Sequence, residues 1–137
     1  MTGLVVCVAV LAAASAYGLL QLRRSGRVRV RGRDDGKRLE AAELGAALGE
    51  RATLVQFSSA FCAPCRATRR VLGEVAGMVP GVTHVEIDAE DHLDLVRRLD
   101  ILKTPTVLVL DAAGNVVRRA TGQPRKADVI AALGEAV

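Results

Sequence analysis

Two cysteines stand two residues apart in the stretch Cys62-Ala63-Pro64-Cys65, between an apolar run of strand length and a pattern typical of a helix. Proline suits a first helical position because no backbone N–H is needed there, so the pair is expected at a helix start. The N–H groups of a first turn and the positive end of the helix dipole favour a thiolate at Cys62. We therefore predict that Cys62 attacks disulfides and that Cys65, shielded one turn further in, resolves the mixed disulfide.

A cysteine pair of this spacing can also be half of a zinc site or a structural disulfide. A closed zinc site needs four ligands, and the other candidates, Cys7, His84 and His92, do not stand at ligand spacing. A silent disulfide is disfavoured because the pair falls at an exposed helix start and because cytoplasmic disulfides are uncommon. Redox chemistry is the favoured interpretation, and we expect no metal and no cofactor.

Strand and helix patterns alternate around the cysteine pair. Strands are expected at residues 53–57, 82–87, 106–110 and 116–120, and helices at 64–78, 93–99 and 127–136, with a further short amphipathic helix around Leu39, Leu44 and Leu48. The turn at residues 113–115 closes the last two strands into a hairpin. Arg69-Arg70 is expected on a solvated helix face. The order predicts an α/β domain with a mixed sheet and helices on both faces.

Several short stretches in residues 37–137 carry a family likeness. They are residues 54–57 running into the cysteine pair, then 85–88, Thr104-Pro105-Thr106, and Gly122. Together they resemble the thioredoxin family, which implies the thioredoxin fold and a cis-proline at Pro105. The resemblance also implies that the backbone of Thr104 pairs with an extended protein substrate beside Cys62. It implies electron transport from a thioredoxin-reductase-like flavoprotein to protein disulfides.

The chain departs from the family pattern next to the first active cysteine. Members usually carry tryptophan where this chain has Phe61 and Ser58, and glycine where it has Ala63. The exchange at Ala63 is expected to change the redox poise modestly, with Phe61 and Pro64 as further tuning residues.

A further departure lies behind the pair. Gln56 stands where thioredoxins commonly bury an aspartate that handles the proton of the second cysteine, and His84 stands where its lysine partner usually lies. Glutamine is no general base at neutral pH. Deprotonation of Cys65 is therefore expected to be slower or to use water or another group.

The N-terminal segment, residues 2–22, has no charged residue. As a helix it spans about 30 Å, the thickness of a bilayer's hydrocarbon core. A cleaved signal peptide needs a basic segment before the apolar stretch and small residues after it, and here Arg23-Arg24 follows instead. A lipoprotein signal is disfavoured because Val6 precedes Cys7. We predict one transmembrane helix at residues 2–22.

The next segment is strongly basic. Between residues 23 and 38 there are eight basic residues and two acids. Nucleic-acid binding is disfavoured because no aromatic residue interleaves with these arginines. We expect a basic linker at residues 23–36 that contacts lipid headgroups and keeps the domain on the cytoplasmic side, with a short edge strand at Val28 and Val30 as an alternative.

Three functions remain open at this point. The leading hypothesis is a membrane-bound oxidoreductase that reduces or exchanges protein disulfides through Cys62 and Cys65. The second places the same chemistry outside the cytoplasm, as in tethered thioredoxin-like proteins that handle apocytochrome or secreted thiols. The third is a non-catalytic binding module that uses the groove beside Pro105, although such a module would not need both cysteines.

Overall fold

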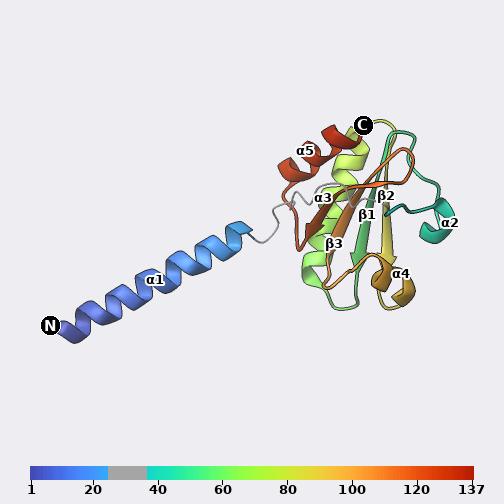
Figure 1. Ribbon diagram of the computed structural model, residues 1–137. Coiled ribbons are helices and arrows are strands. Elements are labelled where there is room, and N and C mark those ends of the chain that lie inside the picture. Colours follow the sequence, from blue (N-terminus) through green and yellow to red (C-terminus); the bar gives the residue numbers. More distant parts are fainter. Residues whose placement is uncertain (25–36) are drawn as a thin grey trace.

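Four strands rich in branched apolar residues form one sheet in the computed structural model, which describes residues 1–24 and 37–137 (Figure 1). The strands are β1 (Ala52–Ser58), β2 (Val82–Asp88), β3 (Thr106–Asp111) and β4 (Val116–Thr121). They lie in the order β2-β1-β3-β4, with β1 parallel to β2 and the other two pairs antiparallel. The expected mixed sheet is confirmed, and β1 lies in its interior.

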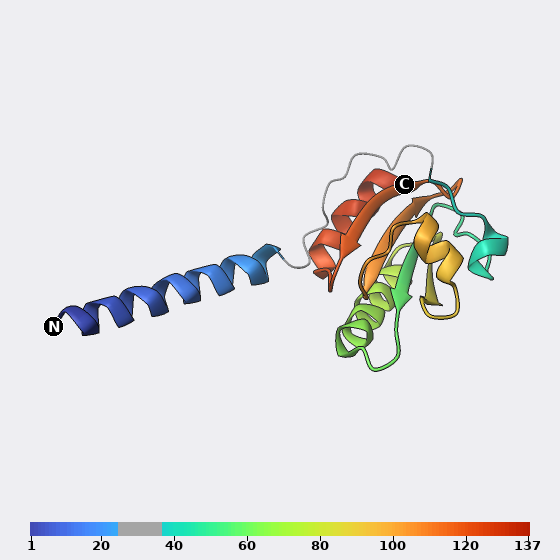
Figure 2. The same ribbon diagram turned by 60° about the horizontal axis from the view of Figure 1, so that its bottom comes forward.

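Helices cover both faces of this sheet (Figure 2). Helices α3 (Ala63–Met78) and α5 (Lys126–Ala136) pack on one face, and α2 (Ala41–Leu44) and α4 (Leu93–Arg98) lie on the other. Alternate residues of β1 feed the two apolar cores: Leu54 packs toward α3 and α5, whereas Val55 and Phe57 pack toward α2 and α4. The thioredoxin fold expected from the sequence is confirmed.

The short helix expected around Leu39, Leu44 and Leu48 is wrong in extent. Only the single turn of α2 is helical, and Gly45 ends it at a left-handed φ of 65°. Leu39 instead lies in extended chain, where its N–H donates to the carbonyl of Gly114 over 2.9 Å. The physical reason is spacing, since five residues turn a helix by roughly 140° beyond one full turn, so Leu39 and Leu44 cannot share one helix face. The three leucines still pack in one core.

The N-terminal helix α1 (Thr2–Arg24) extends two residues further than the expected span. Its segment Thr2–Gln21 is long and apolar enough to cross a membrane, and none of it is buried against the rest of the chain. Length and composition fit the expected anchor and also the alternative of a signal sequence. The remainder of the basic linker, with the alternative strand at Val28 and Val30, lies outside the described residues.

Two loops meet at the end of the sheet where β1 finishes. The cysteine loop, residues 59–62, joins β1 to α3, and the proline loop, residues 99–105, joins α4 to β3. The start of the proline loop is held by Arg119 of β4, whose buried guanidinium donates to the carbonyls of Leu99 over 2.6 Å and Asp100 over 3.1 Å. These loops position the residues singled out in the sequence.

Candidate functional site

Cys62 occupies the N-cap of α3, with extended backbone before the helix begins. Its Sγ accepts a hydrogen bond from the N–H of Cys65 over 3.2 Å, so one of the unpaired donors of the first turn points at the sulfur. Pro64 lies within that turn, where its missing N–H costs nothing. The local geometry therefore directs both the helix dipole and a backbone donor at Cys62.

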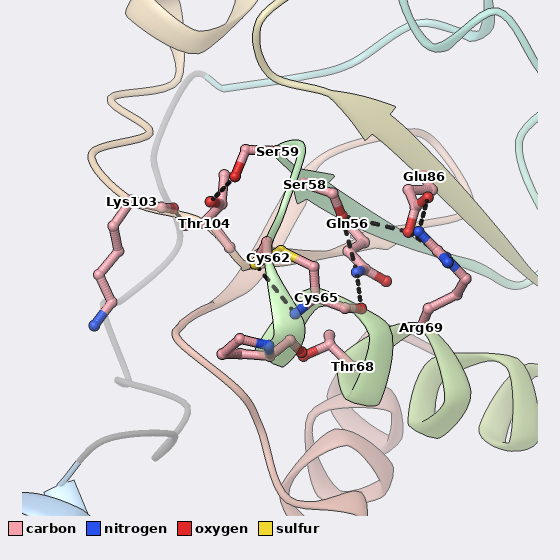
Figure 3. Close-up of a disulfide and its surroundings, with 12 residues drawn as sticks. Gln56, Ser58, Ser59, Cys62, Cys65, Thr68, Arg69, Glu86, Lys103 and Thr104 are labelled. Carbon is pink, nitrogen blue, oxygen red and sulfur yellow. Dashed lines mark hydrogen bonds and ion pairs between the residues drawn. A yellow bond between two sulfur atoms is a disulfide. The ribbon is translucent and has the colours of Figure 1, made fainter.

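The two cysteines form a disulfide, with their Cα atoms 5.2 Å apart (Figure 3). Cys62 is partly exposed, and Ala63 beside it is exposed. Cys65 is only 2% exposed. An incoming group can therefore reach the Cys62 sulfur, whereas Cys65 is shielded by the helix and the sheet.

The proline loop lies against the cysteine loop. The Thr104–Pro105 peptide bond is cis, and the carbonyl of Pro105 accepts the N–H of Gly122 over 2.8 Å. The hydroxyls of Ser59 and Thr104 form a 2.7 Å hydrogen bond between the two loops, drawn in Figure 3. Thr104 is thereby placed at the same end of the sheet as Cys62.

Gln56 is fully buried and lies behind the disulfide, on the strand face that α3 covers. Its amide nitrogen donates to the carbonyl of Cys65 over 2.8 Å and to the hydroxyl of Ser58 over 3.0 Å. Its amide oxygen lies 3.2 Å from Nε2 of His84, so that nitrogen carries the hydrogen. The side chain that replaces an expected carboxylate is therefore the centre of a hydrogen-bonded network.

The network continues to the surface through Glu86 (Figure 3). The Ser58 hydroxyl donates to Oε2 of Glu86 over 3.3 Å, and Arg69 donates to both carboxylate oxygens over 2.7 Å each. Arg69 is exposed on its helix, as expected, and in addition it forms this ion pair with Glu86. The guanidinium of Arg69 thus pairs with the negative charge of Glu86 at the outer end of this network.

His84 is half-buried on β2, beside this network. Burial lowers the pKa of His84 below its usual range, the charge of Glu86 opposes that shift, and the charge of Arg69 adds to it. His84 is therefore neutral at pH 7 and donates from Nε2 to the amide of Gln56. Within residues 1–24 and 37–137, no three histidine, cysteine or acidic side chains are grouped to hold a metal ion.

Comparison with known proteins agrees with this geometry. Residues 38–135 match the family model for thioredoxin, which is well over half of the chain. The chain belongs to the thioredoxin family.

Individual thioredoxins match over part of their length. Thioredoxin H5 of Oryza sativa subsp. japonica is 28% identical over 57 residues, and thioredoxin of Gallus gallus is 34% identical over 65 residues. These matches cover 42% and 47% of this chain, and they span only 42% and 61% of the two relatives. The crystal structure of chloroplastic thioredoxin z superposes with a TM-score of 0.58 at 27% identity, covering 70% of this chain and 88% of that one. Family membership and the spacing of Cys62 and Cys65 together support thiol–disulfide oxidoreductase activity.

This thioredoxin-family chain exposes large apolar side chains on the cysteine loop and on the proline loop. Phe61 is fully exposed and has a left-handed φ of 59°, and Leu102 of the proline loop is 93% exposed. Apolar side chains at such exposure on two neighbouring loops are available to a protein partner.

Sequence reasoning missed Ser59, Glu86 and Arg69 as members of the site. Glu86 left a signal, because it stands two residues from His84 in a strand and so shares its face. No sequence pattern indicates Ser59, because the partner of a serine in a loop cannot be predicted from its position.

Proposed function

We propose that this chain is a thiol–disulfide oxidoreductase that reduces or exchanges protein disulfides, with Cys62 as the attacking thiol and Cys65 as the resolving thiol. One observation carries the proposal: the reachable sulfur of Cys62 caps α3 and is bonded to the buried sulfur of Cys65. A purely structural disulfide needs neither an exposed partner nor a backbone donor directed at it.

The reaction begins from the reduced pair. The Cys62 thiolate attacks one sulfur of a substrate disulfide, which forms a mixed disulfide and releases the other substrate sulfur as a thiolate that takes a proton from water. Cys65 then loses its proton and attacks the Cys62 sulfur. The Cys62–Cys65 disulfide forms, the second substrate thiol leaves, and two electrons have passed to the substrate.

The surroundings of Cys62 support the binding of an extended substrate segment. The backbone of Thr104 lies in the proline loop tied to the cysteine loop, and Phe61 and Leu102 offer apolar contacts on either loop. These contacts favour protein disulfides as substrates, because a small disulfide has no extended backbone or side chains that could use them. The electrons come from a flavoprotein of the thioredoxin-reductase kind.

Reduction of insulin by the full chain in detergent micelles, with dithiothreitol as the electron source, tests the activity. We expect turnover by the wild type and none by Cys62→Ser. If the wild type does not accelerate reduction while Cys62→Ser still captures partner proteins, the chain is a binding module. A reduction potential of about −270 mV favours a reductant and one of about −120 mV an oxidant.

We further propose a domain layout of an anchor at residues 2–22, a linker at 23–36 and a catalytic domain at 37–137, with the domain on the cytoplasmic side. The apolar length of Thr2–Gln21 and the basic residues after it support this orientation. Reporter fusions at the C-terminus test this orientation. The matched variant replaces five arginines by neutral residues and is expected to weaken the cytoplasmic orientation: Arg23, Arg24, Arg27, Arg29 and Arg31. If the unaltered chain gives an extracytoplasmic reporter signal, the domain lies outside the cytoplasm and the same chemistry acts on secreted thiols.

A further inference from the structure

The bond between Ser59 and Thr104 lies where the backbone pairing of β1 and β3 has ended. The last paired positions are Phe57 and Thr106. Continuing that antiparallel register by two residues brings Ser59 opposite Thr104. The two hydroxyls therefore make a cross-strand contact just beyond the sheet.

The backbone pairing of β1 and β3 stops short of this point. Pro105 stands next in the register after Thr106, and its backbone faces β4 rather than β1, because its carbonyl accepts the N–H of Gly122. The hydrogen bond between the side chains of Ser59 and Thr104 is therefore a direct connection between the two loops beyond the paired strands.

Each loop is fixed from behind by separate contacts. The carbonyl of Ser58 accepts the N–H of Ala89 over 2.8 Å, and the hydroxyl of Thr106 donates to the carbonyl of Lys103 over 2.6 Å. These contacts shape each loop without setting the distance between them. The 2.7 Å bond between the partly buried hydroxyls of Ser59 and Thr104 joins the two loops directly.

We propose that Ser59 is a positioning residue: its hydroxyl holds Thr104 so that the backbone of the proline loop stays in register with a protein substrate attacked by Cys62. The proposal rests on the proposed function and adds a residue that acts through Thr104. Ser59 stands three residues before Cys62, and Thr104 directly precedes the cis bond, so a shift of either loop misplaces the substrate backbone relative to the attacking sulfur.

Ser59→Ala in the full chain, in detergent micelles, tests this role against two substrates. We expect kcat/KM for insulin to fall by about five-fold, mainly through KM, because one short hydrogen bond is lost. Reduction of hydroxyethyl disulfide, which has no extended backbone to align, is expected to fall at least about three-fold less than reduction of insulin. Ser59→Thr keeps a hydroxyl and is expected to restore most of the wild-type ratio between the two substrates.

Two further variants separate positioning from loss of stability. Thr53→Val removes a buried acceptor for the N–H of Gly49, far from the loops, and is expected to alter both substrates equally. In a Thr104→Val background, Ser59→Ala is expected to have no further effect, since the bond is already lost. Equal losses on both substrates, or additive losses in the double variant, would overturn the role of Ser59 while leaving the proposed function intact. A wild type that reduces neither substrate would instead overturn the proposed function.

Discussion

On one side of the disulfide, Cys62 is partly exposed between the fully exposed Phe61 and the exposed Ala63. On the other side, Cys65 is 2% exposed, and its carbonyl accepts the amide of the fully buried Gln56. The two cysteines share one disulfide and stand three residues apart, yet Cys62 is accessible and Cys65 is buried. This difference in exposure supports the proposed roles, in which Cys62 attacks the substrate and Cys65 resolves the mixed disulfide.

The largest expected effect separates the two cysteines directly. Cys62→Ser is expected to lower protein-disulfide reduction at least about a hundred-fold, because the reachable nucleophile is gone. Cys65→Ser is expected to keep the attack and to accumulate mixed disulfides that non-reducing gels detect. Cys7→Ser, which changes the free cysteine of α1, is the matched control and is expected to act like the wild type. Equal labelling of Cys62 and Cys65 by iodoacetamide at pH 7, in the reduced Cys7→Ser background, would contradict the expected difference in reactivity between the two thiols.

The enclosed side can be probed with Gln56→Asp. A carboxylate there can take the proton of Cys65, so single-turnover release of the mixed disulfide is expected to become faster near pH 7. Burying the carboxylate is expected to lower the free energy of unfolding by about 1 to 3 kcal/mol, measured by urea titration.

The same variant tests whether His84 can pair with the new charge, since its Nε2 lies 3.2 Å from the present amide oxygen. A protonated His84 would stabilise the carboxylate, so the loss of stability is expected to be smaller at pH 6 than at pH 8. Gln56→Asp combined with His84→Ala is expected to lose most of this pH difference. If the double variant keeps it, burial of the carboxylate alone is responsible.

The exposed side can be probed at Phe61. Its left-handed backbone costs a residue with a Cβ about 1 to 2 kcal/mol, and its side chain is fully exposed. Phe61→Gly is expected to raise the free energy of unfolding by about 0.5 kcal/mol, after the entropy cost of glycine is subtracted. The KM for insulin is expected to rise, because an apolar contact is lost. Phe61→Ala keeps the Cβ, so thermal unfolding is expected to show no such gain.

The smallest expected effect concerns the pH dependence of the enclosed side. Because the pKa of His84 is lowered in the folded state, His84 contributes stability above pH 6.5, and that contribution is lost as the pH falls through the folded pKa. The urea midpoint of the wild type is therefore expected to fall between pH 7.5 and pH 5. His84→Gln is expected to show a shallower fall. A steeper fall in the variant would mean that His84 gains a proton on folding.

The sequence was sufficient for the strands, most of the helices and the cysteine pair, because apolar periodicity and local turn chemistry specify these features. It was insufficient for α2, where Leu39 is drawn into extended chain by the carbonyl of Gly114, a partner far along the chain. The ion pair of Glu86 and Arg69 was missed for a similar reason. It depends on the parallel register of β1 and β2 and on the placement of α3, which no local pattern encodes.

The guanidinium of Arg119 holds the carbonyls of Leu99 and Asp100 at the start of the proline loop, from the interior of the domain. The conformational entropy of this loop is therefore lost once, when the chain folds, and not at each encounter with a partner. A preorganised loop can hold a short disulfide-bearing segment with few contacts and release it quickly. Under the proposed function, in which the loop pairs with an extended backbone segment, the domain can then serve many unrelated partners in turn.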